Sequence, residues 1–252
     1  MRNFKAVIHS MFFLVVALLT IFSVPFDSQA VDKNGDLIKA ARIGDIPAIK
    51  NLLEAGADVN AKDERDRTAL NLALSLENPE AAKLLINKGA DVTIKDSFGG
   101  LTPLEEASAQ GYTEVAELIL QKLKDKTDKN PALLNAVINS RLDTAKMLLN
   151  NKADPNFKDS SGNSALNLAK PSNIEMLGLL LDAGANINAL DQNKQTVLMS
   201  ASYKGDVNLV KYFLSKKADV NIKGLRDMTA LDFAKQMDNT EVIKLLQSAG
   251  AK

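Results

Sequence analysis

The stretch Gly56-Ala57-Asp58-Val59-Asn60 returns 33 residues later as Gly89-Ala90-Asp91-Val92-Thr93. Three further copies follow: Lys152-Ala153-Asp154-Pro155-Asn156, Gly184-Ala185-Asn186-Ile187-Asn188 and Lys217-Ala218-Asp219-Val220-Asn221. Self-similarity at a period between 20 and 50 residues is typical of proteins built from stacked repeats. The sequence therefore predicts an elongated stack.

A second motif lies between these copies at the same period. Each copy starts with Thr or Ser, has Leu two positions later and has Ala five positions later. The copies are Thr68-Ala69-Leu70-Asn71-Leu72-Ala73, Thr102-Pro103-Leu104-Glu105-Glu106-Ala107, Ser164-Ala165-Leu166-Asn167-Leu168-Ala169, Thr196-Val197-Leu198-Met199-Ser200-Ala201 and Thr229-Ala230-Leu231-Asp232-Phe233-Ala234. The hydroxyl residue is expected to cap a helix, because its oxygen accepts a hydrogen bond from an N–H of the first turn. Leu and Ala three residues apart give that helix one apolar side.

Each of these helices is expected to be followed by a turn and a second helix. Gly44, Gly111 and Gly205 mark the turn, where a positive φ favours glycine. The second helices contain the apolar triplets Leu84-Leu85-Ile86, Leu118-Ile119-Leu120, Met147-Leu148-Leu149, Leu179-Leu180-Leu181 and Tyr212-Phe213-Leu214. One pair of helices cannot bury such faces alone, so neighbouring pairs must complete the core. Counting pairs predicts seven units, near residues 35–65, 66–98, 99–128, 129–161, 162–193, 194–226 and 227–252.

The two motifs together resemble the ankyrin repeat, whose period is 33 residues and whose signature is Thr-Pro-Leu-His-x-Ala. The resemblance covers essentially all of residues 34–252 and implies an all-α ankyrin-repeat solenoid with short β-hairpin-like fingers. In the family, the His ties neighbouring repeats by hydrogen bonds. That position here holds Asn71, Glu105, Asn167, Met199 or Asp232. Asn or Asp can replace His in part and Met199 cannot, so we expect a stack less stable than a consensus one.

The fourth unit is predicted to be irregular. Pro131 occupies the Thr position, and the chain reads Lys122-Leu123-Lys124-Asp125-Lys126-Thr127-Asp128-Lys129 where another Gly-Ala-Asp is expected. The spacing to Lys152 is about four residues short of a period, which predicts a shortened or missing finger. A hinge in a binding face would explain this, but the charged composition favours simple drift in a solvated turn.

The first thirty residues have the layout of a secretory signal peptide. Arg2 and Lys5 precede an apolar run over residues 6–24, and Ser28-Gln29-Ala30 provides small residues for cleavage after Ala30. The alternative is an uncleaved membrane anchor. We expect a mature chain 31–252 in the periplasm, with secretion or N-terminal anchoring as alternatives. The chain has no Asn-x-Ser/Thr sequon, which favours a bacterial periplasm over a eukaryotic secretory route.

The composition excludes several chemistries. The chain has 31 basic and 31 acidic residues, a balance that argues against nucleic-acid binding. It has no Cys, and its one His, His9, would leave with the signal segment, so the mature chain has no thiolate or imidazole for catalysis or for a metal. It has no P-loop and no Gly-x-Gly-x-x-Gly. We therefore predict no cofactor, no metal, no catalytic residues and no enzyme activity.

The predicted function is binding of another protein, by a monomer that does not contact a membrane after cleavage. In ankyrin stacks, partners usually dock on the concave side, formed by the finger tips and the exposed ends of the first helices. The positions that this implies here are Arg42, Ile43, Arg65, Arg67, Leu76, Phe98, Tyr203, Lys204, Leu225, Arg226, Met228 and Met237. Inhibition, protection or adaptation of an envelope enzyme are possible roles. The alternatives are a carboxylate-dependent cell-wall hydrolase and an effector delivered to a host cell.

Overall fold

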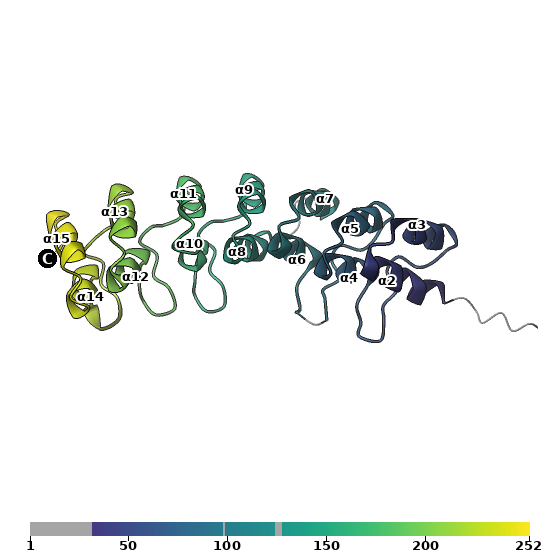
Figure 1. Cartoon of the computed structure of the whole chain (residues 1–252), viewed down its shortest axis with the longest axis horizontal. Coiled ribbons are helices and arrows are strands. Elements are labelled where there is room, and N and C mark those ends of the chain that lie inside the picture. Colours follow the sequence, from purple (N-terminus) through teal and green to yellow (C-terminus); the bar gives the residue numbers. More distant parts are fainter. Residues whose placement is uncertain (1–31, 98, 124–127) are drawn as a thin grey trace, which may run out of the picture.

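The computed structural model describes residues 32–97, 99–123 and 128–252, and within them it contains α-helices and no strands (Figure 1). The helices form seven antiparallel pairs: α2 (Lys33–Ile43) with α3 (Ile46–Glu54), α4 (Ala69–Ser75) with α5 (Pro79–Asn87), α6 (Pro103–Gln110) with α7 (Thr113–Leu123), α8 (Asn130–Ile138) with α9 (Leu142–Asn150), α10 (Ala165–Leu168) with α11 (Ile174–Asp182), α12 (Val197–Lys204) with α13 (Val207–Ser215), and α14 (Ala230–Gln236) with α15 (Thr240–Ser248). The predicted stack of seven units is confirmed.

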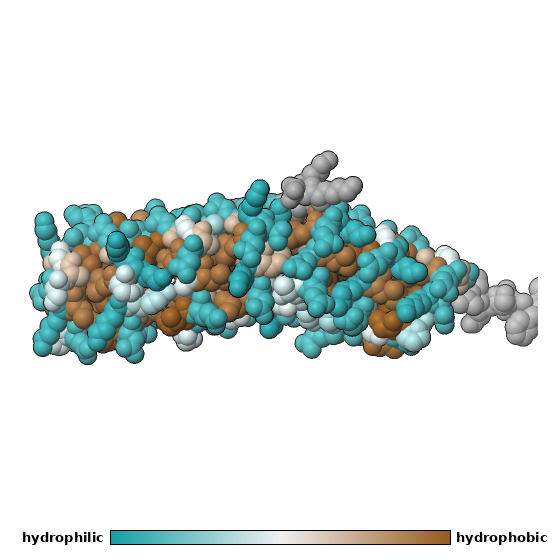
Figure 2. All heavy atoms as spheres, turned by 90° about the horizontal axis from the view of Figure 1, so that it is seen from above, coloured by the Kyte–Doolittle hydropathy of each residue, from teal (hydrophilic) through white to brown (hydrophobic). Residues whose placement is uncertain are grey.

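The units stack side by side in chain order. In Figure 1 the second helices, α3 to α15, form an upper layer, the first helices, α2 to α14, form a lower layer, and the fingers project below. Two fingers close with an isolated antiparallel bridge, Lys62 to Thr68 and Lys158 to Ser164. Seen from above, apolar atoms fill the space between neighbouring helices along the whole stack, and polar side chains lie across them (Figure 2). The core is therefore continuous from unit to unit rather than gathered in one centre.

The predicted N-caps are present at the four Thr positions, whereas Ser164 only donates its N–H and hydroxyl to Asn167 Oδ1. The hydroxyl of Thr68 accepts a hydrogen bond from the N–H of Asn71 at 3.2 Å, and Asn71 Oδ1 in turn accepts from the Thr68 N–H at 3.0 Å. Thr102, Thr196 and Thr229 form the same reciprocal arrangement with the residue three positions later. The predicted turn residues Gly44, Gly111 and Gly205 have φ of 73°, 82° and 70°. Capping and turn geometry explain why these motifs recur at one period.

The cap of the last first helix predicts an acid-dependent loss of stability. Thr229 donates its N–H and hydroxyl to Asp232 Oδ2, both at 2.9 Å, and these bonds lower the pKa of Asp232. The ionised carboxylate therefore stabilises the fold above the unfolded-state pKa of about 3.9, and this contribution is lost as the pH falls through the lower folded-state pKa. We expect Asp232→Asn to be less stable than wild type at pH 7, and the difference to shrink in urea unfolding at pH 3.

Asn is the matched replacement, because an Asn at the equivalent position already works in another unit. Asn71 Oδ1 accepts the same two hydrogen bonds, from the N–H and the hydroxyl of Thr68, at 3.0 and 2.9 Å, and an amide does not titrate in this range. A difference between wild type and Asp232→Asn that stays constant from pH 7 to pH 3 would contradict the prediction.

At the family's His position, side-chain amides tie a first helix to the finger that follows it in the chain. Asn71 Nδ2 donates to the carbonyl of Ile94 at 3.2 Å, and Asn167 Nδ2 donates to that of Ala189 at 3.5 Å. Met199 offers only its sulfur, which lies 3.3 Å from the N–H of Thr196 in its own unit. As predicted, Asn takes over part of the hydrogen bonding of the family's His, and Met199 does not, because a thioether has no hydrogen to donate.

A second set of ties joins the bases of successive fingers. The Asn that ends each Gly-Ala-Asp motif accepts a backbone N–H from the next unit, as in Asn60 from Asp91 at 2.8 Å and Asn188 from Asp219 at 2.9 Å. Thr93 replaces that Asn in the second unit, and its hydroxyl donates to Asp91 in its own turn at 2.7 Å. The series of Asn ties is therefore interrupted before the fourth unit.

The predicted short finger falls partly on residues 124–127, which lie outside the described residues. Residues 124–129 separate α7 from α8, whereas residues 88–102 separate α5 from α6. The first helices α6 and α8 pack directly against each other. The stack continues through this junction by helix packing.

The fifth unit is also irregular, which the sequence analysis did not predict. Its first helix, α10, has only four residues and ends at Leu168, and Ala169 then turns to extended backbone with ψ of 136°. Pro171 is the physical reason, because the residue before a proline is disfavoured in helical geometry and proline itself has no N–H to donate. The shortened helix leaves a cavity beside α12.

The predicted signal segment, residues 1–30, lies outside the described residues. No helix in the described part of the chain has the length and apolar character needed to cross a bilayer.

Candidate interaction surface

Exposed apolar side chains recur at the carboxyl ends of the first helices. We call the following set the helix-end row: Ile43 (73% exposed), Leu76 (44%), Ile138 (44%), Tyr203 (45%) and Met237 (43%). Each member lies one or two residues before a residue with positive φ that starts the turn to the second helix. An apolar side chain is therefore exposed at one of two adjacent positions at this end of the helix in five of the seven units. Ile43, Leu76 and Met237 directly precede the positive-φ residue, and Ile138 and Tyr203 stand one residue earlier.

Tyr203 is held in position rather than free. Its ring meets the buried ring of Phe233 edge to face, with centroids 6.1 Å apart, and its carbonyl accepts a hydrogen bond from Asn239 at 3.2 Å. The sequence analysis predicts a partner contact for this residue. The structure shows that one side of the ring packs against the next unit while almost half of the side chain stays exposed.

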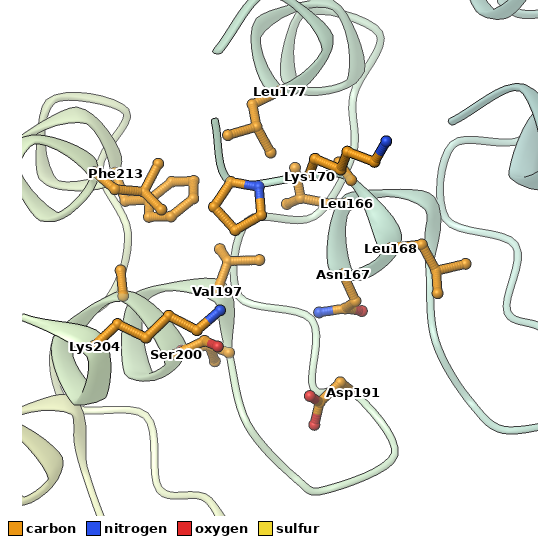
Figure 3. Close-up of a pocket in the computed structure, with 15 residues that line it drawn as sticks. Leu166, Asn167, Leu168, Lys170, Leu177, Asp191, Val197, Ser200, Lys204 and Phe213 are labelled. Atoms are coloured by element: carbon orange, nitrogen blue, oxygen red, sulfur yellow. The ribbon is translucent and has the colours of Figure 1, made fainter. Parts of the chain in front are cut away.

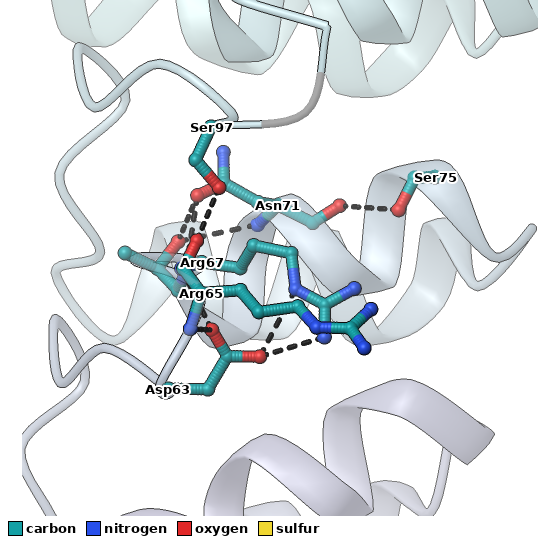
Figure 4. A network of polar contacts seen from close by, with 7 residues as sticks. Asp63, Arg65, Arg67, Asn71, Ser75 and Ser97 are labelled. Carbon is teal, nitrogen blue, oxygen red and sulfur yellow. Dashed lines mark hydrogen bonds and ion pairs between the residues drawn. The ribbon is translucent and has the colours of Figure 1, made fainter.

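The first finger is organised around Asp63 (Figure 4). Its carboxylate accepts both backbone N–H groups of Arg65 and Arg67 at 2.9 Å, and the Arg67 guanidinium through Nε at 3.0 Å and Nη2 at 2.7 Å. Partial burial alone would raise the pKa of Asp63, but the hydrogen bonds from Arg67 and Arg65 outweigh it and the pKa is lowered. Arg67 thus has a structural role in its own finger.

Arg65 is more available than Arg67. Its side chain is exposed, and its carbonyl accepts a hydrogen bond from Ser97 Oγ of the next finger. Arg42 is exposed at the end of α2, and together with Arg67 it lines an open hollow of about 680 Å³ between α2 and the first finger. Asp32, Asp58, Asp63 and Glu64 also line this hollow, so the amino-terminal part of the surface carries both signs of charge.

Two later fingers repeat the turn around an Asp. Asp159 accepts the N–H groups of Ser161 and Asn163, both at 2.9 Å, and Asp191 accepts those of Asn193 and Gln195, both at 2.8 Å. These bonds pin each finger locally, so the tips are ordered by their own sequence.

The last finger departs from this pattern. Gly224 replaces the Asp, and the tip forms a short 3-10 turn, η1 (Leu225–Asp227), in which Arg226 has a φ of 57°. Leu225 is 56% exposed and Arg226 is exposed, as a contact surface requires, whereas Met228 is half-buried against the core. Met228 is therefore a weaker candidate than its two neighbours.

The remaining predicted positions divide as follows. Lys204 is exposed next to Tyr203, and Phe98 lies outside the described residues. Ile138 belongs to the helix-end row but was missed by the sequence analysis. The sequence contains a signal for this position, because Asn139-Ser140 stands where other units have the glycine that precedes the second helix. Ser140 adopts the positive φ, of 58°, that glycine has in those units.

In the described part of the chain, no three or more Asp, Glu, His or Cys side chains are grouped so that they could hold a metal ion. Every buried side-chain N or O atom that the structure describes has a hydrogen-bond partner.

Known proteins with ankyrin repeats are similar to this chain in sequence and in structure. The family description "Ankyrin repeats (3 copies)" matches residues 37–130, 121–191 and 170–252. The chain belongs to the ankyrin-repeat family. Among solved structures, the ankyrin repeat domain of Bcl-3 is similar with a TM-score of 0.73 and 27% identity, over 84% of this chain and 97% of that one. The human ASB11 ankyrin repeat domain has a TM-score of 0.72 and 22% identity, over 86% and 98%, and supports the fold alone.

Curated relatives are similar over only part of their own length. The ankyrin repeat and KH domain-containing protein mask-1 of Caenorhabditis elegans is 32% identical over 85% of this chain and 8% of its own. The putative palmitoyltransferase ZDHHC13 of Danio rerio is 30% identical over 84% of this chain and 34% of its own. The phosphocholine transferase AnkX of Legionella pneumophila is 25% identical over 84% of this chain and 25% of its own. This chain therefore shares their repeats and spans about a third of their length or less.

Proposed function

We propose that this ankyrin-repeat protein binds a protein partner outside the cytoplasm, through the surface formed by the helix-end row and the finger tips, after residues 1–30 are removed. Ankyrin repeats are protein-interaction scaffolds. The observation that supports this surface is the helix-end row, in which five large apolar side chains stay exposed within two residues of the turn between the helices of a unit. Aromatic and Met side chains in such a row are typical of interface centres.

The proposed mechanism is presentation of a pre-ordered surface. Tyr203 is fixed by Phe233 and Asn239, and the fingers are fixed by Asp63, Asp159 and their bonded neighbours. Side chains that are ordered before docking lose little conformational entropy on binding. A surface along seven units offers roughly 800 Å² to a partner, which is the size of a standard interface.

We propose a role as inhibitor, protector or adaptor of an envelope enzyme. The signal-peptide layout of residues 1–30 supports the compartment, and the near balance of charges supports a protein rather than a nucleic acid as partner. The relatives named for enzyme activities match this chain over only 34% and 25% of their lengths, which favours binding over a hydrolase activity in the repeats.

The test compares two isoleucines with equal exposure in different places. Ile138 belongs to the helix-end row, whereas Ile174 begins α11, a second helix, and each is 44% exposed. We expect Ile138→Ser, combined with Met237→Ser, to reduce recovery of a partner from an envelope extract at least tenfold, since apolar anchors dominate interface energies. Ile174→Ser is expected to leave recovery unchanged.

Each variant is first checked for unchanged thermal unfolding. Equal recovery with all baits, or a stronger loss with Ile174→Ser, would contradict the proposed surface. Intact mass of the protein recovered from its native source tests export: loss of residues 1–30 supports it, and retention supports the anchor.

A further inference from the structure

A half-open cavity of about 280 Å³ lies between the fifth and sixth units (Figure 3). Apolar side chains of four helices form most of its wall: Leu166 from α10, Leu177 from α11, Val197 from α12, and Leu209 and Phe213 from α13. Pro171 also lines the cavity, and Asn167, Asp191 and Ser200 add polar groups to its wall. We call this space the α10–α12 cavity.

Two departures from the repeat produce the α10–α12 cavity. The first is Pro171, which ends α10 after one turn and removes the helix wall that other units have there. The second is Ser200, which stands four residues after its N-cap. At that position the second, fifth and seventh units have Leu72, Leu168 and Phe233, so a large apolar side chain is missing from the sixth unit. The hollow is therefore specific to this pair of units.

One cation points into the opening. In Figure 3 the ammonium group of Lys204 extends toward Val197, whereas the chain of Lys170 extends away from the cavity. Lys204 makes no ion pair and no side-chain hydrogen bond with the described residues. Asp191, the acidic residue on the wall, already accepts two backbone N–H groups of its own finger at 2.8 Å. The opening thus has an apolar floor and one unpaired positive charge.

The volume limits the occupant to about one large side chain. An apolar cavity of roughly 150 Å³ holds benzene, whereas sites for drug-sized ligands and cofactors are about 300–1,000 Å³. A space of about 280 Å³ therefore accommodates an aromatic ring or a leucine with part of its backbone. A side chain alone would leave Lys204 unpaired, and an adjacent carboxylate would pair it.

We propose that the α10–α12 cavity binds an acidic segment of a partner protein, with an aromatic or leucine side chain inside the cavity and the carboxylate of a neighbouring Asp or Glu paired with Lys204. This inference rests on the proposed function and names the chemistry of the partner at one point of the surface. Tyr203, next to Lys204, links this point to the helix-end row.

The test uses three short probes and backbone amide NMR shifts of the full mature chain. The probes are acetyl-Phe-Glu-amide, its neutral match acetyl-Phe-Gln-amide, and acetyl-Ala-Glu-amide, which lacks the ring. We expect acetyl-Phe-Glu-amide to bind in the millimolar range and to shift the amides of Val197, Ser200 and Phe213. The neutral probe is expected to bind about two- to fivefold more weakly, as for the loss of an exposed ion pair. The probe without the ring is expected to shift none of them.

Variants separate the cavity from the rest of the surface. Ser200→Leu restores the side chain present at Leu72 and is expected to abolish the shifts. Lys204→Met is expected to remove the difference between the Glu and Gln probes while the ring still binds. Lys235→Met, in α14 and outside the cavity lining, is the charge-matched control and is expected to preserve that difference.

Absence of shifts at the cavity with 20 mM probe, equal binding of the Glu and Gln probes to wild type, or unchanged binding in Ser200→Leu would each overturn the proposal. Failure of the proposed function looks different. In that case the probes bind as described, but no partner depends on Ile138 and Met237. The converse result is a partner that depends on the helix-end row and binds Ser200→Leu as well as wild type. That result supports the proposed function and shows that the partner does not contact the α10–α12 cavity.

Discussion

Leu85→Ala and Leu180→Ala are each expected to lower the free energy of unfolding by about 2–5 kcal/mol. Leu85 lies in α5 and Leu180 in α11, and both are fully buried between neighbouring units. Removing three carbon atoms from either site loses their transfer free energy and leaves a space that the helices on both sides cannot fill. Urea unfolding, followed by circular dichroism at 222 nm, measures the change.

Neighbours in the same triplets provide the control. Leu84 and Leu179 are only partly buried, so Leu84→Ala and Leu179→Ala are expected to cost clearly less than their buried neighbours. The comparison keeps the helix, the substitution and the change in helix propensity the same. If Leu84→Ala cost as much as Leu85→Ala, the orientation of α5 in the stack would be wrong.

The sequence predicts most of the fold because the repeat has local causes. Thr68 caps a helix by bonds to Asn71, three residues away, and Gly44 and Gly205 turn the chain by their own φ. Such signals are complete within a few residues and recur at one period. The predicted number of helix pairs and the short interval before α8 followed from them.

The parts that the sequence analysis missed depend on a single residue or on a neighbouring unit. Pro171 shortens α10, and its effect is visible in the sequence only when each helix is read by itself rather than as a copy. Arg67 is not free to contact a partner, because its guanidinium donates two hydrogen bonds to the carboxylate of Asp63 in the same finger. The exposure of Ile138 follows from Ser140 taking the place of a glycine. Partner residues therefore need the structure, while the scaffold does not.

Gly224→Ala is expected to lower the free energy of unfolding by about 1–3 kcal/mol, in the range of an overpacked site. Gly224 begins the last finger, and a Cβ there would overlap the backbone carbonyl oxygen of Lys194 in the preceding finger. That oxygen belongs to the main chain and moves only if the finger moves. Urea unfolding measures the loss, and Gly178→Ala is the control.

The control is expected to change stability in the opposite direction. Gly178 lies inside α11, and a Cβ there meets only the Tyr212 hydroxyl, at 3.4 Å, so Ala is expected to stabilise the helix by about 0.5–1 kcal/mol.

Comparison of the fingers alone suggests a different outcome for Gly224. Asp63, Asp159 and Asp191 hold the same place in other fingers and organise the turn there, so a repeat consensus would select Gly224→Asp as a stabilising change. The close approach to Lys194 applies to any Cβ, and we therefore expect Gly224→Asp to destabilise as well. A gain in stability from Gly224→Asp would show that the last finger adopts the regular turn when its Asp is present. A loss would show that contact between fingers, and not the local turn, determines which residue fits.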